Sequence, residues 1–357
     1  MTPLILLIPW LVASAAAATT PAAATQPRLD AAFYNLWATQ IDWTAAQWEE
    51  DLGYMKGIGI DWAFITYTSC DDHSTYTAYC WSGAKSTNAT QVLYKSSNAS
   101  YVQIGDDVLG RFLAAADKLG VKVLVGLLLI PMPDDEIASV GQTYLTLIDD
   151  LHAGYGHHSS FGGYYLTQEW GWRAGDFNLS RADTISRSFL GPISDKIHSL
   201  NSSLEVGLSP SLFDTTTFFP CPASFPNDYT TYSKCGGRPT PAIGNFEPPS
   251  TWAAWWLRAL KDAPHFSWLF VQDHRGGGES PTHIRAYLRA LSTAMASVGV
   301  KNWANSELFH VMSVDDPPHG YGEGNQTRTV APIDRVHRQL LEEAPLVSGF
   351  TCWEFHW

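Results

Sequence analysis

Eight short apolar runs that alternate with helical segments are the feature that most constrains the fold of this chain. The run KVLVGLLL at 122–129 is apolar throughout, as expected of a strand buried on both faces. Helices are expected at 44–56, 106–119, 134–153, 180–200, 251–263, 280–298 and 331–344. Strands are expected at 31–39, 61–69, 122–129, 162–170, 205–212, 266–273, 301–309 and 347–355. This alternation, with no linker between halves, predicts a single α/β domain, a (β/α)8 TIM barrel over residues 31–357.

Local signals mark where the helices begin and which fold competes with the barrel. Thr44 and Ser250 are expected helix caps, and Pro281 is expected at the first position of its helix. A doubly wound sheet would need a glycine-rich phosphate turn after the first strand, and NLWATQIDW contains none. Long loops at 71–105 and 213–249 are expected at the C-terminal face of the strands, where they would shape specificity.

The N-terminal sequence MTPLILLIPWLVASAAAATT predicts export. Its apolar run followed by small residues fits a signal peptide over residues 1–18, although a basic start is missing. A membrane anchor would need about twenty apolar residues, and Pro9 interrupts this run. Residues 19–30, rich in Ala, Pro and Thr, are expected to be a disordered lead-in. We therefore expect a secreted, extracellular protein.

Sequons and cysteines agree with passage through a secretory pathway. Five Asn-x-Ser/Thr triplets are candidate glycosylation sites, at Asn88, Asn98, Asn178, Asn201 and Asn325. Two local disulfides are expected, Cys70 with Cys80 and Cys221 with Cys235, and Cys352 is expected to be a buried thiol. A zinc site is the alternative, but the cysteine spacings do not match one.

Charge and aromatic content limit the partners. A net charge of −13 argues against nucleic acid and against strongly anionic polymers, which it would repel. The 15 tryptophans suit stacking on sugar rings as well as core packing. No segment after the leader is long and apolar enough to span a bilayer. We expect a carbohydrate substrate, no nucleic acid, no stable membrane insertion and a monomer.

Acidic residues stand at the expected C-terminal ends of four strands. All strands of a TIM barrel point to one rim, and chemistry collects at that rim. The four acids are Glu169, Asp273, Glu307 and Glu354. Four acids on one rim are more than solubility requires, so this rim is the expected active site.

Glu169 and Glu307 form the expected catalytic pair, because the fourth and seventh strands lie across the barrel from each other. Glycosidic cleavage needs one carboxylic acid to protonate the leaving oxygen and one carboxylate to attack or to activate water. We assign Glu169 as acid/base and Glu307 as nucleophile of a retaining glycoside hydrolase. The alternatives are salt-bridged glutamates at strand ends, an inverting enzyme that pairs Glu169 with Asp273, and a non-catalytic carbohydrate-binding barrel.

Amide and aromatic side chains near the same strand ends are expected to bind the sugar. Asp273 is expected either to bind substrate or to support the pair electrostatically, and His274 to be either a site residue or a satisfied rim histidine. Glu354 either lies in the site or pairs with an arginine at barrel closure, and each aromatic ring could instead belong to the core. The expected substrate-binding residues are Gln168, Asp273, His274, Asn305, Tyr67, Trp170, Trp172, Trp303, Trp353 and Glu354.

Two other patterns carry less weight. Asp71-Asp72-His73 and His157-His158 resemble metal ligands, but neither has a matching third ligand nearby, so solvated loops are expected. The serines of LSPSL lack a G-x-S-x-G setting, so a serine hydrolase has little support. We expect neither a metal nor an organic cofactor.

Four segments occur in an order that resembles a known family. They are KGIGID at 56–61, GYYLTQE at 163–169, VQDHRG at 271–276 and WANSELF at 303–309. With KVLVGL and SPSL, they make the chain similar to the domain-of-unknown-function 4434 family, described as TIM-barrel glycoside hydrolases. The resemblance implies the barrel and a glycosidase-like site at Glu169, Asp273 and Glu307, but no substrate. Gln168, His274 and Arg275 depart from the pattern, which puts the ligand contacts in doubt more than the fold.

Overall fold

The structure is a computed structural model, and part of the chain is described in it. The described residues are 26–36, 40–71, 90–129, 135–170, 178–211, 248–275, 281–311 and 328–353. The expected signal peptide, Trp172, Glu354, Asn88 and Asn325 lie outside these residues, as do Cys80, Cys221 and Cys235. The predictions for them therefore stay predictions.

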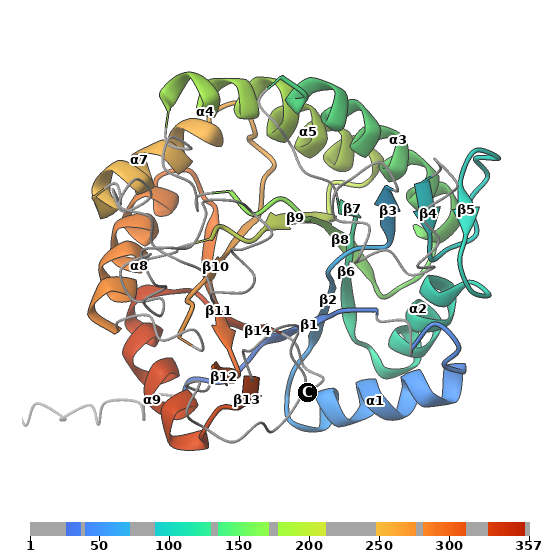
Figure 1. Ribbon diagram of the computed structural model, residues 1–357, viewed down its shortest axis with the longest axis horizontal. Coiled ribbons are helices and arrows are strands. Elements are labelled where there is room, and N and C mark those ends of the chain that lie inside the picture. Colours follow the sequence, from blue (N-terminus) through green and yellow to red (C-terminus); the bar gives the residue numbers. More distant parts are fainter. Residues whose placement is uncertain are drawn as a thin grey trace, which may run out of the picture.

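Eight parallel strands close into a barrel in chain order, and Figure 1 shows the helices in a ring around them. The barrel closes where β1 pairs with β14, Ala31 opposite Thr351. The strands are β1 (Ala31–Tyr34), β2 (Trp62–Ile65), β6 (Lys122–Gly126), β8 (Phe161–Leu166), β9 (Glu205–Leu208), β10 (Trp268–Gln272), β11 (Lys301–Glu307) and β14 (Phe350–Trp353). The prediction of a TIM barrel is confirmed.

Each gap between successive barrel strands contains helix within the described residues. A π-helical turn at Ser186–Leu190 joins α4 to α5, where one continuous helix was expected. Thr44 caps α1 as predicted, and Pro281 is the first residue of α8. The helices are α1 (Ala45–Gly57), α2 (Val108–Leu119), α3 (Ile137–Tyr155), α4 (Leu179–Ile185), α5 (Gly191–Leu200), α7 (Pro249–Ala259), α8 (Pro281–Ala296) and α9 (Ile333–Glu343).

The expected cap of α7 is wrong by two residues. The helix begins at Pro249 with Pro248 as its N-cap, so Ser250 lies inside the first turn. Proline suits the first helical position because its fixed φ is helical and its missing N–H would have no intrahelical partner. None of the helices in the described parts of the chain is long and apolar enough to cross a membrane.

Two small sheets lie beyond the barrel strands. β3 (Ser69–Asp71), β4 (Thr90–Val92), β5 (Val102–Gln103) and β7 (Leu128–Leu129) form one, and β12 (Phe309–Val311) pairs with β13 (Arg328–Val330) in the other. The prediction that the strands at 61–69, 122–129 and 301–309 were continuous is therefore wrong. Each apolar run changes sheets near its C-terminal end, so hydrophobicity alone overestimated the strand length.

Glycine at the start of β8 lets that strand approach its neighbour. Gly163 has a φ of 144°, and a Cβ there would overlap the backbone oxygen of Glu205 in β9. Only glycine fits both the dihedral angle and the space. The FGG sequence thus brings β8 close to β9 at the base of the segment that leads to Glu169.

Alternation along the strands divides the core into two clusters. Inside the barrel, the rings of Phe33, Phe64, Tyr165, Phe270 and Trp303 pack together with other apolar side chains. The alternate residues, such as Tyr164 and Leu166, pack outward against the helices. Cys352 of β14 faces outward, and it is free and buried, as predicted. The same alternation decides which residues at the rim face the barrel interior.

Candidate active site

Two polar residues at the C-terminal rim share the inward face. Trp268 and Phe270 point into the barrel, so the alternation carries Gln272 inward at the end of β10. The same count from Trp303 carries Glu307 inward at the end of β11. Glu169 follows the end of β8, and the charges of Glu307 and His274 both act on its carboxyl. Glu169 and Glu307 come from the fourth and seventh strands of the barrel, and the charge of Glu307 reaches the Glu169 carboxyl.

Glu169 is exposed as a whole residue, but protein groups of both charges crowd its carboxyl. The water that these groups displace around the carboxyl raises its pKa, and the charge of Glu307 raises it further. The charge of His274 and the side chain of Gln272 act in the opposite direction, but the net pKa stays raised. A raised pKa keeps a carboxylic acid protonated closer to neutral pH, as a proton donor requires.

Glu307 is held on three sides at the end of β11. Its side chain is 10% exposed, and its Oε1 lies 3.3 Å from Nδ1 of His274. Its backbone N–H donates to Oδ1 of Asp273 at 3.2 Å, and its carbonyl accepts from Nη2 of Arg335 at 2.6 Å. Hydrogen bonds to both its N–H and its carbonyl therefore fix the backbone of Glu307, the expected nucleophile.

Asp273 lies behind the barrel wall, with no solvent exposure. It follows Gln272 and so faces outward, where Oδ1 accepts the N–H of Arg275 at 3.1 Å and Oδ2 accepts the amide of Gln339 on α9. Burial and the charge of Glu307 raise its pKa to about 7. The expectation of direct substrate binding is corrected by this burial, and the other expected role, support of the pair, fits the contacts.

His274 occupies a strained backbone position between two partners. Its φ is 49°, in the left-handed region that non-glycine residues seldom adopt. The ring is 4% exposed, with Nδ1 at 3.3 Å from Glu307 Oε1 and Nε2 at 3.2 Å from Ser211 Oγ. The ring therefore lies beside the expected catalytic pair, and its two partners also fit the other expected role of a satisfied rim histidine.

The side chains of Gln168 and Asn305, the two amides expected to bind the sugar, point to opposite faces of the barrel wall. Gln168 is buried, and its Nε2 donates to the hydroxyl of Tyr144 on α3 at 3.1 Å. It has the outward parity of Leu166, so the expected sugar contact is corrected: Gln168 ties the segment before Glu169 to α3. Asn305 has the inward parity of Trp303 and is 1% exposed, and neither polar atom of its amide has a hydrogen-bond partner in the structure. The amide therefore makes no hydrogen bond to Glu307 in the structure, and the expected sugar contact of Asn305 stays a prediction.

Two of the tryptophans that were expected to bind the sugar lie in the core. Trp170 is 4% exposed and packs against Phe189 and Trp256, with ring centroids at 5.4 and 6.4 Å. Trp303 stacks on Trp268 inside the barrel at 5.3 Å. The sugar-binding prediction for these two residues is corrected, because both belong to the core.

Two aromatic residues remain near the rim. Trp353 ends β14, is half-buried, and lies opposite Glu307 in the strand register. Tyr67 follows β2 and is 7% exposed. Trp353 is therefore the described tryptophan best placed to contact a ligand beside the carboxylate pair.

Sequence reasoning missed four residues that surround the pair. Gln272 and Ser211 follow inward-facing positions of β10 and β9, so strict counting of the alternation would have found them. Arg335 and Gln339 come from α9, about thirty residues after Glu307, and no local pattern links them to the site. They are found only when the fold brings α9 against β10 and β11.

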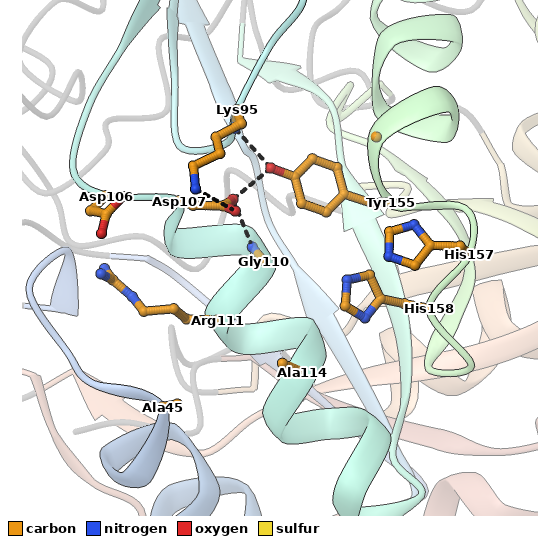
Figure 2. Close-up of a pocket in the computed structure, with 11 residues that line it drawn as sticks. Ala45, Lys95, Asp106, Asp107, Gly110, Arg111, Ala114, Tyr155, His157 and His158 are labelled. Atoms are coloured by element: carbon orange, nitrogen blue, oxygen red, sulfur yellow. Dashed lines mark hydrogen bonds and ion pairs between the residues drawn. The ribbon is translucent and has the colours of Figure 1, made fainter.

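Figure 2 shows a separate pocket outside the barrel, between α2 and the C-terminal end of α3. The hydroxyl of Tyr155 donates to Asp107 at 2.5 Å and accepts the N–H of Lys95 at 2.7 Å. His158 Nδ1 lies 2.7 Å from Asp117. These pairings hold α2 to α3, so the candidate site remains at the strand ends. Among the described residues, no three His, Cys, Asp or Glu side chains form a group that could hold a metal ion.

Residues 29–356 match the family described as Domain of unknown function (DUF4434). The chain belongs to this family, as the four ordered segments indicated. Comparison with curated proteins finds no match.

Solved structures share the barrel. A candidate alpha-L-fucosidase from Bacteroides thetaiotaomicron is 15% identical with a TM-score of 0.63, covering 92% of this chain and 88% of that one. A GH18 chitinase from Pseudoalteromonas aurantia is 11% identical with a TM-score of 0.45, covering 91% and 93%. An intracellular xylanase from Thermoanaerobacterium saccharolyticum is 9% identical with a TM-score of 0.46, covering 91% and 85%. At these identities the first comparison shows a common fold alone, and the other two carry no further argument.

Proposed function

We propose that this protein is a secreted glycoside hydrolase that cleaves a polysaccharide or glycoconjugate by a retaining mechanism. One observation carries the proposal: at the C-terminal rim the charge of Glu307 acts on the Glu169 carboxyl, and the pKa of Glu169 is raised. Two carboxyl groups in different protonation states are what glycosidic cleavage requires. That the candidate alpha-L-fucosidase shares the barrel agrees with this proposal.

Each glutamate has one role in each half of the reaction. Glu169 donates its proton to the glycosidic oxygen while the Glu307 carboxylate attacks the anomeric carbon, which gives a glycosyl ester on Glu307 and frees the leaving group. Glu169, now ionised, takes a proton from water, and that water cleaves the ester. The half-buried Trp353, opposite Glu307 in the strand register, is the side chain that we expect to contact the sugar beside the carboxylate.

Charge and surface features support the substrate class and the location. The net charge of −13 favours a neutral or weakly charged glycan. Asn178 and Asn201 are exposed and Asn98 is partly exposed, and each uses its Oδ1 in a surface turn. Such positions can accept a glycan, as expected of a secreted glycoprotein with disulfides.

The two competing functions have weaker support. An inverting enzyme that pairs Glu169 with Asp273 would need Asp273 in the cleft, and this carboxyl has no exposure. A carbohydrate-binding barrel without catalysis would bind glycans but would not need a raised pKa at Glu169. The second competitor is separated from an enzyme only by experiment.

A glycan panel tests the proposal. The full chain, expressed through a secretory host, is incubated with neutral and weakly charged polysaccharides and glycoconjugates, and released sugars are detected by mass. We expect release by the wild type and a loss of about 10³-fold or more in Glu307→Gln and in Glu169→Gln. Glu50→Gln on the exposed face of α1 is the matched control and should retain full activity.

Product stereochemistry by NMR then tests the retaining route. Initial release of the opposite anomer would support inversion instead. If the wild type releases no sugar from any member of the panel, and Glu307→Gln binds the same glycans as the wild type, the protein is a binding barrel and the proposed activity is wrong.

A further inference from the structure

His274 has contacts that substrate binding alone does not explain. Its backbone is left-handed, and such strain persists where the surrounding structure imposes it. Both ring nitrogens face partners, Nδ1 toward Glu307 at 3.3 Å and Nε2 toward Ser211 at 3.2 Å. A ring that is 4% exposed and engaged at both ends is fixed in orientation.

Carboxyl groups from three directions face this ring. Glu307 contacts it from β11, Asp273 precedes it in the chain, and Glu169 acts on it from the segment after β8. Burial lowers the pKa of His274, but the hydrogen bond and charge of Glu307, with the charges of Asp273 and Glu169, outweigh burial and raise it. The neighbouring cation, Arg275, is directed to Glu342 on α9 at 3.8 Å. The His274 ring contacts Glu307 directly and, when protonated, places a positive charge beside the pair.

We propose that His274 is a further catalytic residue of this site: its imidazolium holds Glu307 as a carboxylate, so that the proton of the pair resides on Glu169. This inference rests on the proposed function for the roles of the two glutamates. Two nearby carboxyl groups share protons according to their surroundings, and a cation stabilises the ionised form of the carboxyl that it touches. Because His274 contacts Glu307, the two carboxyl groups have different surroundings, and Glu307 is the one stabilised in its ionised form.

Ser211 has the position of a nucleophile but is better suited to orient the ring. Ser211, His274 and Glu307 follow the connectivity of a hydrolase triad, Oγ to Nε2 and Nδ1 to carboxylate. Ser211, however, has no solvent exposure, which leaves no space for an acyl group on its oxygen. Its hydroxyl can accept from Nε2–H while Nδ1–H donates to Glu307, which fits the charged ring.

NMR titration of the histidine rings tests the coupling without a substrate. Rings labelled with ¹⁵N are followed against pH, and the His274 signal is assigned by its absence in His274→Asn, because asparagine tolerates a positive φ. We expect the His274 midpoint to fall by about one pH unit or more in Glu307→Gln. His158, paired with Asp117 outside the barrel, is the internal reference for effects of the substitution that are not local. A His274 midpoint that is the same in Glu307→Gln and wild type would overturn the inference.

The carboxyl groups give the second measurement. With ¹³C-labelled glutamate, the Glu307 signal is assigned by its loss in Glu307→Gln. We expect this carboxyl to stay ionised from about pH 5 to 8 in the wild type and to take up a proton within that range in His274→Asn. If Glu307 stays ionised in His274→Asn as well, another group holds its charge and the inference is wrong.

Kinetics on a glycan cleaved in the panel tests the catalytic role. We expect His274→Asn to lower kcat by about tenfold to a hundredfold with little change in KM, and added imidazole to restore activity to His274→Gly. A purely structural histidine would give a less stable protein with an unchanged pH profile and no rescue. If Ser211→Ala instead abolishes acetate release that the wild type performs on an acetylated polysaccharide, Ser211 is a nucleophile and our assignment fails.

The two proposals fail separately. If no glycan is cleaved but both titrations behave as expected, the proposed function is wrong and the His274–Glu307 coupling stands without a catalytic role. If glycans are cleaved but neither titration responds to the substitutions, the inference about His274 is wrong and the proposed function stands.

Discussion

Replacing Arg335 with leucine should disturb the carboxylate pair from outside the barrel. Nη2 of Arg335 donates to the carbonyls of Glu307 at 2.6 Å and Phe309 at 2.8 Å, and Nη1 donates to Oε1 of Gln339 at 2.8 Å. Gln339 in turn donates to Asp273, which accepts the N–H of Glu307. The contacts form a closed circuit of hydrogen bonds, in which Arg335 and Gln339 of α9 hold the carbonyl of Glu307 directly and its N–H through Asp273.

The magnitude follows from the number of bonds lost. Hydrogen bonds that involve a charged group contribute about 1.5–3 kcal/mol each, and three are lost in Arg335→Leu. Because the guanidinium is half-buried, water can replace part of them, so we expect a fall of about 2–4 kcal/mol in the free energy of unfolding. We expect kcat to fall about tenfold or more, since a shift of the Glu307 backbone misaligns the nucleophile. KM should change little, because Arg335 lies behind the barrel wall.

Urea unfolding and initial rates on a cleaved glycan measure the two effects. Arg338→Leu is the matched control on the same helix, since Arg338 is exposed and its Nε donates to a carbonyl of its own helix at 3.2 Å. Arg335→Lys, which keeps the charge but not the planar fork, should retain part of the stability. Equal losses of stability and kcat in Arg335→Leu and Arg338→Leu would refute the circuit.

Two further predictions concern Asp273 and the tryptophans. The folded pKa of Asp273, raised from 3.8 to about 7, exceeds the unfolded value, so the stability contributed by its proton is present below about pH 4 and lost as pH rises through about 7. Asp273→Asn cannot ionise and should flatten that slope in urea unfolding at several pH values; an unchanged slope would show that another group titrates. Trp170→Ala should cost about 3–5 kcal/mol of stability as a core truncation, whereas Trp353→Ala should mainly raise KM; the reverse pattern would contradict our placement of the two rings.

The fold was predictable because its signal is repeated. Each of the eight apolar runs is ambiguous by itself, but eight of them separated by amphipathic segments admit few arrangements. The boundaries were less predictable, since Ser69–Asp71 and Leu128–Leu129 remain apolar or extended while they change to another sheet. Local propensity does not record which neighbour a strand will pair with.

The sequence predicted which acids stand at the rim, but not the direction in which each side chain points. Glu169, Asp273 and Glu307 all stand at strand ends in sequence, and the structure places Glu307 inward and Asp273 outward. Gln168 was misplaced for the same reason, because proximity to a strand end was counted without the alternation. The α9 contacts had no sequence signal, since an arginine on an amphipathic helix is ordinary.

Crowding of acids at one rim explains why α9 and His274 are both needed. The charge of Glu307 raises the pKa of both Glu169 and Asp273, so repulsion destabilises the ionised site as pH rises. A cation in the cleft offsets this repulsion for the carboxyl that must stay ionised, and the uncharged amide of Gln339 stabilises Asp273 from behind. If the repulsion were offset equally for all three acids, none would be left as a proton donor. The unequal distribution of partners is therefore the property that separates an acid from a nucleophile in this barrel.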